Sequence, residues 1–456
     1  MSLTHYNFAS KLSKLWRLSR THNFNIKKHQ IRGIEWAIQR EYVEKHKGGI
    51  FADEMGLGKT LQMLMTVVCN DTNSDGCYGD NKTLIILPLP LIEQWIEATR
   101  KITNTNPYVY HPLYKNEVYE DNPITITSYG LLGKQKSFII EKKWKRVIFD
   151  ESHHIKNRKT SCFKGCKELS SDIFWFISGT PVQNTIKDVY GPLQLLKYEL
   201  VSIKRKLERK EILKSCLLKR SKASVGLKLP KMNKHDIYID WENNEEEKIA
   251  KSAHIRAELI NMRENNENLY EVTGSEKKIV RLLRAKQSCI NTNMVPIANS
   301  LDTVKISTKI EKVYNTIKSI GFTKPKLVFC QFHSEIDMLY DSLSKDIEEH
   351  DLTMEKFDGR TTIEKRREIL QNTPNILILQ IQCGCEGLNL QQYKEVYFIS
   401  PHWNPAIEDQ AIARCHRIGQ TEVVNVYKFY MNKLYDGDSV DLYIKYVQDR
   451  KREEYI

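Results

Sequence analysis

Short runs of consecutive apolar residues recur along the chain and alternate with amphipathic stretches in its first two hundred and last hundred and fifty residues. Runs of this length, apolar on both faces, are typical of strands buried in a parallel sheet. They fall at residues 49–52, 83–87, 146–149, 173–177, 326–330, 376–379 and 396–399. Because strands that alternate with helices build α/β domains, the pattern predicts an α/β fold with two parallel-sheet domains.

The pattern becomes charged and helical between residues 198 and 303. We therefore expect an N-terminal domain over residues 1–197, a helical insertion or linker over 198–303, and a C-terminal domain over 304–456 that ends in a helix. The insertion carries a basic stretch at residues 204–222 and an acidic patch that begins at Glu245. Each could be a solvated helix face, and the basic stretch could instead contact DNA.

Composition narrows the class of protein. Hydrophobic residues make up 41% and charged residues 28% of the chain, as in soluble globular proteins. No apolar run reaches the roughly 18 residues of a membrane span. The formal charge of +13 favours a polyanionic partner, although charge alone does not identify nucleic acid.

The ten cysteines are scattered and form no paired C-x-x-C motifs. This spacing predicts neither a zinc module nor a disulfide framework, and it favours a reducing compartment. The first 34 residues contain no Asp or Glu, and Leu12, Leu15, Trp16 and Leu18 could line one helical face. Such a segment fits an organellar transit peptide or a helix that docks or contacts DNA.

The stretch Asp-Glu-Met-Gly-Leu-Gly-Lys-Thr at residues 53–60 follows an expected strand. Gly56 and Gly58 would let backbone N–H groups cradle phosphates at the start of a helix. Lys59 would reach the β- and γ-phosphates, and the Thr60 hydroxyl would ligate Mg²⁺. A chance match to Gly-x-Gly-Lys-Thr is the alternative.

Two carboxylates follow the apolar run at residues 146–149. Asp150 and Glu151 would lie at the carboxyl end of a strand, where α/β sheets bind ligands. Asp150 could hold Mg²⁺, and Glu151 could orient and deprotonate an attacking water. A solvated acidic turn would look the same in isolation, but the position after a P-loop-like stretch favours the catalytic interpretation.

A third candidate lies near the end of the chain, where Arg414 and Arg417 stand three apart in a stretch expected to be helical. This spacing places both guanidinium groups on one helical face. Arginines supplied from another domain stabilise a phosphoryl group in transfer, by about 10³–10⁵ in rate. A surface ion-pair helix is the alternative, which the other two candidates disfavour.

In this order the three parts resemble the helicase-like ATPases of superfamily two, and specifically the Swi/Snf family of double-stranded DNA translocases. The resemblance covers about residues 26–450. Its most specific segments are Ile155-Lys156-Asn157, after the acidic pair, and Trp403-Asn404-Pro405, before the arginines. It implies two RecA-like lobes, ATP and Mg²⁺ as cofactors, and double-stranded DNA as partner.

The resemblance also assigns roles to individual residues. It implies catalytic roles for Lys59, Glu151, Arg414 and Arg417, with Mg²⁺ held by Thr60 and Asp150. Nucleotide contacts are expected from Gln30, which would read adenine, and from Gly56, Gly58, Lys59, Thr60, Asp150 and Gln410. DNA contacts are expected from Pro88, Thr125, Thr127, Lys156, Asn157, Gln331, Asn389 and Trp403. Residues 178–184 match the motif that couples the ATP site to DNA.

Asp53 stands where the common P-loop pattern has its first glycine. The chain departs from the family pattern at two positions, and at the first of them Ser152 replaces the usual alanine beside the acidic pair. Cys385 stands in place of a glycine, which would cost about 1 kcal/mol or more if that turn needs φ > 0. Residues 144–151 and 386–391 look most like the branch of repair translocases that carry a RING, yet no RING-like cysteine cluster lies between residues 198 and 303.

We therefore expect an ATP-dependent translocase that follows double-stranded DNA by backbone contacts, without strand separation. A single-strand DNA or RNA helicase of the same superfamily and a non-catalytic DNA-binding scaffold are the alternatives. Nucleosomes or other DNA-bound proteins would be its targets, in the nucleus or another DNA-containing compartment such as a viral factory or virion, and organellar import stays open.

Overall fold

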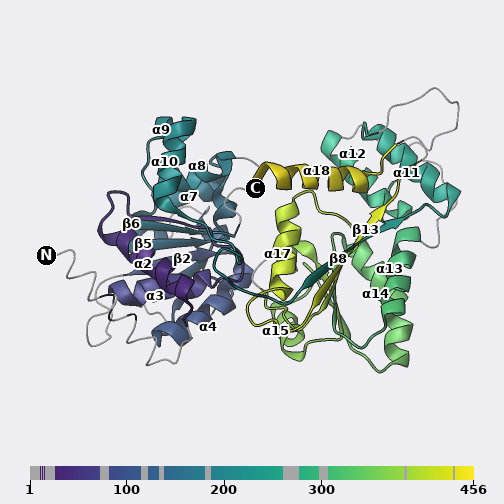
Figure 1. Ribbon diagram of the computed structural model, residues 1–456, viewed down its shortest axis with the longest axis horizontal. Helices are drawn as coiled ribbons and strands as arrows, with labels where there is room; N and C mark the ends of the chain where they lie inside the picture. The colour runs from purple at the N-terminus through teal and green to yellow at the C-terminus, as the bar shows by residue number, and fades with distance from the viewer. Residues whose placement is uncertain are drawn as a thin grey trace. The chain divides into compact units, whose positions relative to one another are not determined.

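The computed structural model describes residues 11, 13, 15, 26–71, 82–114, 122–132, 138–179, 186–259, 277–296, 307–384, 388–434 and 437–455. The chain divides into two compact units, Met1–Lys228 and Leu229–Ile456. Each unit has its own sheet (Figure 1), and each has its own hydrophobic cores.

The first unit is built on a parallel sheet of seven strands in the order β3-β4-β2-β5-β6-β1-β7. The strands are β1 (Gly48–Phe51), β2 (Thr83–Leu87), β3 (Tyr108–Tyr110), β4 (Ile124–Ser128), β5 (Lys143–Asp150), β6 (Ser170–Ile177) and β7 (Leu217–Leu218). Successive residues of β2 enter opposite cores, Leu84 and Ile86 one, Ile85 and Leu87 the other. The sheet is therefore covered on both faces, which explains its uninterrupted apolar strands.

Helices α2 (Lys28–Tyr42), α3 (Lys59–Asp71) and α4 (Ile92–Thr103) cover one face of this sheet. The other face is covered by α5 (Tyr129–Leu132), α6 (Phe138–Glu141), α7 (Ser161–Glu168), α8 (Tyr190–Leu195), α9 (Leu200–Lys204) and α10 (Lys206–Cys216). Three short 3₁₀ helices join them, η1 (Leu89–Leu91), η2 (Ser152–Ile155) and η3 (Ile186–Val189).

The second unit contains a parallel sheet of six strands in the order β10-β11-β9-β12-β13-β8. The strands are β8 (Met232–Ile239), β9 (Lys326–Cys330), β10 (Met354–Phe357), β11 (Ile376–Gln380), β12 (Glu395–Phe398) and β13 (Val424–Met431). Its first strand, β8, pairs with its last strand, β13.

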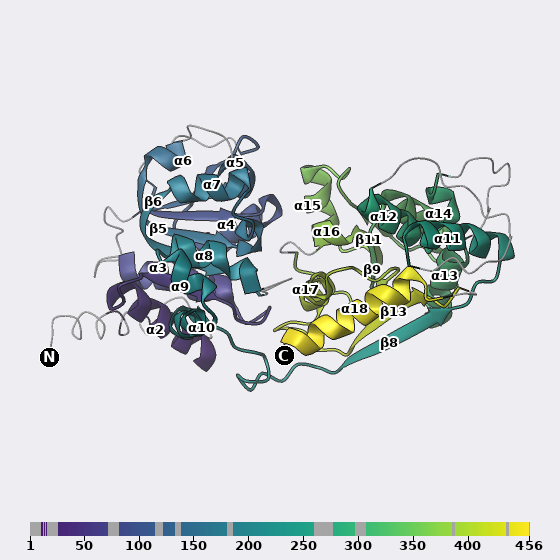
Figure 2. The same ribbon diagram turned by 90° about the horizontal axis from the view of Figure 1, so that it is seen from above.

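One face of this sheet packs against α12 (Lys278–Ser288), η4 (Thr292–Met294), α13 (Thr308–Ile320), α14 (His333–Glu349) and α18 (Val440–Tyr455). Helix α11 (Asn244–Arg256) packs against α12. The opposite face packs against α15 (Ile363–Asn372), α16 (Ile381–Gly384) and α17 (Pro405–Cys415). Figure 2 shows α18 beside α17, and the two are joined by a hydrogen bond from Gln448 to Glu408.

The sequence prediction of two parallel-sheet α/β domains is confirmed, and each of the seven predicted apolar runs forms a strand. The expected helical insertion over residues 198–303 is instead divided between the units, since β7 pairs with β1 and β8 pairs with β13. Apolar residues of α9 and α10 complete the first unit's core, whereas α11 and α12 belong to the second unit. In the described residues, no helix is both long and apolar enough to cross a membrane.

Candidate functional site

The predicted P-loop joins the carboxyl end of β1 to the first residue of α3. Gly56 and Gly58 have φ values of 85° and 79°, a region that glycine enters without the steric cost of a side chain. A Cβ on Gly58 would also lie 2.4 Å from Nε2 of Gln30. The loop thus needs both glycines for its conformation, as the sequence pattern predicts.

Side chains from α2 and α3 hold this loop by its backbone. The Leu57 carbonyl accepts hydrogen bonds from Nε2 of Gln30 at 3.3 Å and Nε2 of Gln62 at 3.1 Å, and a ring nitrogen of His29 lies 3.2 Å away. The Gln30 Oε1 accepts from the Lys27 amide at 3.0 Å. Gln30, the expected adenine reader, therefore lies directly against the P-loop.

Lys59 is the first residue of α3, and its side chain points back over the P-loop. Its Nζ donates to the Asp53 carbonyl at 2.7 Å. The neighbouring wall is the end of β6, where a Cβ on Gly179 would come within 3.6 Å of the same Nζ. Thr60 follows in the first turn of α3.

Asp150 is the last residue of β5, and Glu151 follows it with φ 47° and ψ 52°, in the left-handed region. The Asp150 carboxylate accepts from the Trp95 indole at 2.7 Å and from the Glu151 amide at 2.9 Å. Burial, followed by the adjacent Glu151 carboxylate, raises the pKa of Asp150 to about 6, against the lowering effect of Lys59. The sheet order β5-β6-β1 brings Asp150, Gly179 and the P-loop to neighbouring strand ends.

This edge offers a donor set that fits a nucleotide with Mg²⁺. The carboxylate of Asp150 and the hydroxyl of Thr60 are oxygen ligands of the kind Mg²⁺ prefers. A cation would offset the repulsion between Asp150 and Glu151 that raises the Asp150 pKa. The positive-φ glycines leave backbone N–H groups near the start of α3 for phosphate oxygens.

The arginine pair belongs to the second unit. Arg414 lies in the last turn of α17, but the helix ends at Cys415, so Arg417 lies in the following turn and not on the helical face that the spacing predicted. Burial and, secondarily, the Arg414 charge lower the pKa of Arg417. The two charges therefore act on one another although Arg417 lies beyond the end of the helix. Gln410 is buried in α17.

The residues of the first unit that were expected to contact DNA differ in their exposure to solvent. Asn157 is exposed and Lys156 half-buried, just after the acidic pair, whereas Pro88 is buried at the end of β2. Thr125 and Thr127 are only 2% and 0% exposed within β4, and the Thr127 hydroxyl donates to the Tyr110 carbonyl. Direct DNA contact by these two threonines is not supported, because their side chains fill the interior between sheet and helices.

In the second unit, Gln331 and Trp403 come together after β9 and β12. The Gln331 amide donates to the Pro401 carbonyl at 3.1 Å, and the same carbonyl accepts from Lys286 at 2.6 Å. The Lys286 ammonium lies 5.9 Å from the Trp403 ring centroid. Asn389 is exposed.

Several site residues were not found from the sequence. Trp95 binds the Asp150 carboxylate, and Tyr129 donates to the Asp150 carbonyl at 2.7 Å. Arg220 forms an ion pair with Asp53 at the start of the P-loop. The one available signal was the unusual Asp53 itself, a charged residue at a position where glycine is common.

Some expected features lie outside the described residues. These are residues 180–184 of the coupling motif, Cys385 with residues 386 and 387, and Leu12, Trp16 and Leu18. Leu15 is described and is 1% exposed in the first unit's core, and Lys11 donates to the Asn70 carbonyl at 3.2 Å.

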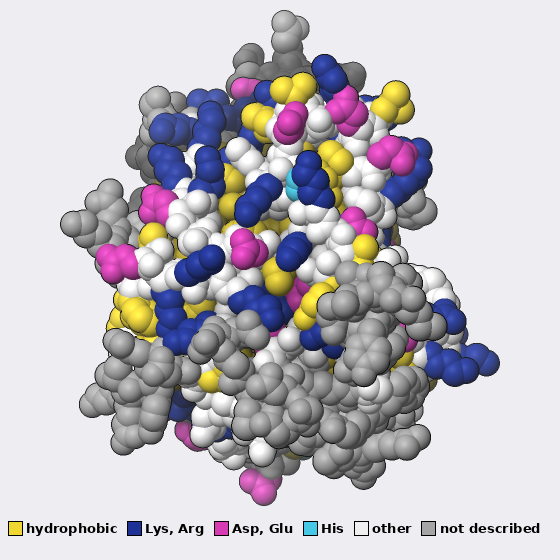
Figure 3. All heavy atoms as spheres, turned by 90° about the vertical axis from the view of Figure 1, so that its left-hand side faces the viewer, with side chains coloured by type: hydrophobic (Ala, Val, Ile, Leu, Met, Phe, Trp, Pro, Cys, Tyr) yellow, Lys and Arg dark blue, Asp and Glu magenta, His cyan; other side chains and the backbone are white. Residues whose placement is uncertain are grey.

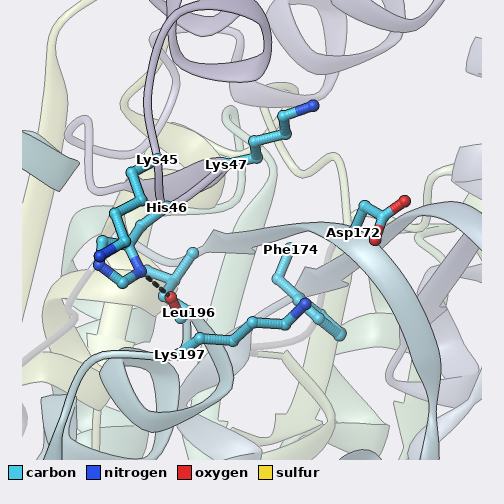
Figure 4. A pocket seen from close by; sticks show the side chains of 7 residues that line it. All are labelled: Lys45, His46, Lys47, Asp172, Phe174, Leu196 and Lys197. Carbon is cyan, nitrogen blue, oxygen red and sulfur yellow. Dashed lines mark hydrogen bonds between the residues drawn. The ribbon is translucent and has the colours of Figure 1, made fainter.

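A pocket elsewhere on the first unit is lined by Lys45, His46, Lys47, Asp172, Phe174, Leu196 and Lys197 (Figure 4). It lies at the amino ends of β1 and β6, opposite the strand ends that carry the P-loop. It contains no predicted site residue. Among the described residues, no cluster of three or more His, Cys, Asp or Glu side chains could hold a metal ion.

Two family models match the chain. The SNF2-related domain matches residues 29–210, and the helicase conserved C-terminal domain matches residues 308–419. The first match spans the P-loop and the acidic pair, and the second spans the arginine pair.

Curated relatives and a solved structure are similar over most of the chain. A "Probable global transactivator" of Orgyia pseudotsugata multicapsid polyhedrosis virus is 29% identical, over 94% of this chain and 90% of the relative. The "ATP-dependent DNA helicase DDM1" of Arabidopsis thaliana and the "DNA repair protein RAD5" of Candida albicans are each 25% identical, over 88% and 89% of this chain. The chain spans only 58% and 56% of the length of these two. The "Sulfolobus solfataricus SWI2/SNF2 ATPase core in complex with dsDNA" covers 90% of this chain, and the chain covers 88% of it, with 22% identity and a TM-score of 0.41.

The family matches fall on the units that carry the two halves of the expected site, in the order that the sequence motifs predict. The chain belongs to the Swi/Snf family of helicase-like, DNA-dependent ATPases of superfamily two.

Proposed function

We propose that this protein is an ATP-driven translocase on double-stranded DNA. The observation that carries the proposal is the convergence of Lys59, Asp150 and Glu151 at neighbouring strand ends of the first sheet. A phosphate cradle, a cation ligand and a base in one place are what ATP hydrolysis requires.

Each residue has a role in this proposal. Backbone N–H groups of the P-loop and the Lys59 ammonium hold the phosphates, and Gln30 reads the base. Thr60 and Asp150 would hold Mg²⁺, which would supply positive charge against the phosphate oxygens. Glu151 orients the attacking water and takes its proton. Arg414, Arg417 and Gln410 act from the second unit, with the arginines stabilising the phosphoryl group in transfer.

Double-stranded DNA is the proposed track. The chain carries a formal charge of +13, and on the face drawn in Figure 3 lysine and arginine side chains are spread among acidic ones. Lys156, Asn157, Gln331, Asn389 and Trp403 are the proposed contacts. Relatives named as a DNA helicase and a DNA repair protein support DNA over RNA. Nucleosomes or other DNA-bound proteins are the proposed targets, in a DNA-containing compartment.

The test compares ATP hydrolysis with no nucleic acid, duplex DNA, single-stranded DNA and RNA, together with displacement of a triplex-forming strand from a duplex. We expect duplex DNA to stimulate hydrolysis most and the triplex to be displaced only with ATP. Glu151→Gln should lower kcat by about 10²–10⁴, the usual contribution of a general base, while nucleotide still binds. The matched control is Glu97→Gln, which removes an exposed carboxylate of α4.

Stimulation by RNA or single strands instead would support a helicase of the same superfamily. DNA binding with no hydrolysis would support a non-catalytic scaffold. Full turnover by Glu151→Gln would reject the assigned base.

A further inference from the structure

The P-loop of the first unit begins with a buried carboxylate that has one cationic partner among the residues that the structure describes. Asp53 stands where the common P-loop pattern has a glycine, and its side chain is 0% exposed. Nε of Arg220 donates to Oδ1 of Asp53 at 2.9 Å, and a second guanidinium nitrogen pairs with Oδ2. This two-point contact fixes the plane of both groups.

The same guanidinium reaches two further groups around the nucleotide site. It donates to the His29 carbonyl, beside Gln30, and to Oε1 of Gln62 at 2.9 Å. Gln62 in turn donates to the Leu57 carbonyl of the P-loop. A Cβ on Gly33 would lie 1.9 Å from Oε1 of Gln62 and 2.8 Å from Arg220, so this glycine makes room for the contact.

The backbone around Arg220 continues the pairing of β7 with β1 into the loop. The Ala52 amide donates to the Leu218 carbonyl at 2.7 Å, and the Glu54 amide donates to the Arg220 carbonyl at 2.8 Å. The Lys222 amide then donates to the Glu54 carboxylate at 2.7 Å. Residues 218–222 are thus held along residues 52–54, at the start of the P-loop.

This segment also leads into the connection between the first unit and the second. The first unit ends at Lys228, and β8 of the second unit begins at Met232. Few residues therefore separate this segment from the second sheet. A shift of the P-loop on binding nucleotide can therefore pass through these hydrogen bonds and the ion pair to residues 218–222, and from there along a short stretch of chain into the connection between the units.

We propose that Arg220 is a positioning residue of the nucleotide site, which fixes the start of the P-loop through Asp53 and ties the inter-unit connection to it. This inference rests on the proposed function, because it assumes that the P-loop binds nucleotide. It explains why an aspartate replaces the common glycine: the carboxylate anchors the connection.

The test uses the full chain with Arg220→Gln, Asp53→Asn, the double variant and the conservative Arg220→Lys. The matched control is Arg100→Gln, which removes an exposed arginine of α4 that contacts Asn106. Hydrogen exchange is followed in peptides covering residues 52–60 and 221–231, without nucleotide and with ADP and MgCl₂. The KM and kcat for ATP are measured alongside.

In the wild type, ADP should slow exchange in both peptides. In Arg220→Gln, nucleotide-free exchange at residues 52–60 should rise about 10- to 100-fold, as expected when a hydrogen bond to a charged group is lost. The ADP effect on residues 221–231 should disappear, and KM should rise more than kcat falls. The double variant should be no worse than either single one, and Arg220→Lys should be intermediate.

Several results would overturn the inference. Additive effects of the two single substitutions would do so, as would an ADP response of residues 221–231 in Arg220→Gln equal to the wild type. A wild type in which ADP protects residues 52–60 but not 221–231 would reject this inference alone. A wild type in which ADP protects neither peptide would reject the proposed function as well.

Discussion

At the scale of single residues, the ionised form of Asp150 is destabilised in the nucleotide-free protein. Burial and Glu151 raise its pKa to about 6, whereas an aspartate ordinarily titrates near 3.8. The folded protein therefore binds this proton more tightly than the unfolded chain. Stability from this group is fully present below about pH 4 and is lost as the pH rises through about 6.

We accordingly expect Asp150→Asn to be relatively more stable at high pH. The difference between its effects on the free energy of unfolding at pH 5 and pH 8 should be about 1.4 kcal/mol, because pH 5 lies only about one unit below the raised pKa and each unit is worth about 1.4 kcal/mol. Comparing two pH values cancels the hydrogen bonds that asparagine loses at both. Urea unfolding without nucleotide measures this, with exposed Asp172→Asn as control. An effect that is the same at both pH values would contradict the raised pKa.

The sequence identified the residues that chemistry requires and missed those that hold them. Gly56, Gly58 and Lys59 are contiguous, so their pattern is visible in one stretch. Trp95 and Asp150 are 55 positions apart, and Asp53 and Arg220 are 167 apart. Such partners become adjacent only when the sheet forms. Arg417 was placed on a helical face because nothing in its spacing signalled that α17 ends at Cys415.

At the scale of elements, a fully buried ion pair joins α13 to α18 in the second unit. Lys309 and Asp441 both have 0% exposed side chains, and Asp441 Oδ2 also accepts from the Met431 amide at 3.0 Å. Asp441 Oδ1 has no hydrogen-bond partner among the described residues. The pair is therefore costly to break from one side only.

We expect Lys309→Met to destabilise the protein by about 3–5 kcal/mol, because it leaves a buried carboxylate alone. Adding Asp441→Asn should restore most of this loss, since asparagine is neutral and can still accept from Met431. Thermal unfolding of both variants tests this. The exposed Lys433–Asp438 pair supplies the control, and Lys433→Met should cost less than about 1 kcal/mol. A double variant as unstable as Lys309→Met would show that the charge is not the cause.

Elements were predictable where apolar residues run without interruption. β9 and β11 each contain four consecutive apolar residues and were found, whereas β8 and β13 contain no such run and were not. β8 is an edge strand with three consecutive exposed residues at 234–236. β13 is interrupted by Lys428, which pairs with Glu408 of α17 in the folded protein. Such strands cannot be predicted from a local apolar pattern, because the polar residues that interrupt them find their partners elsewhere in the chain.

At the scale of the whole molecule, the proposed binding to double-stranded DNA predicts how the affinity depends on salt concentration. Binding through phosphates releases counterions, so affinity falls steeply as salt rises. If about 6–10 phosphates are contacted, affinity for a short duplex should fall about 10³–10⁵-fold between 50 and 200 mM salt. Fluorescence anisotropy with two duplexes of unrelated sequence measures this, and both should give the same slope. A flat salt response, or a strong preference for one sequence, would point to base recognition instead.

The pairing of β8 with β13 determines when the second sheet can be completed during synthesis of the chain. The first unit has its last strand once Leu218 has left the ribosome, but Asn233 of β8 meets Asn425 of β13 only 192 residues later. At about 5–20 residues per second, β8 waits about 10–40 s for its neighbour. During this interval the exposed Lys234 and Asp236 protect β8 from aggregation, because charged side chains on an unpaired edge strand oppose its pairing with another chain.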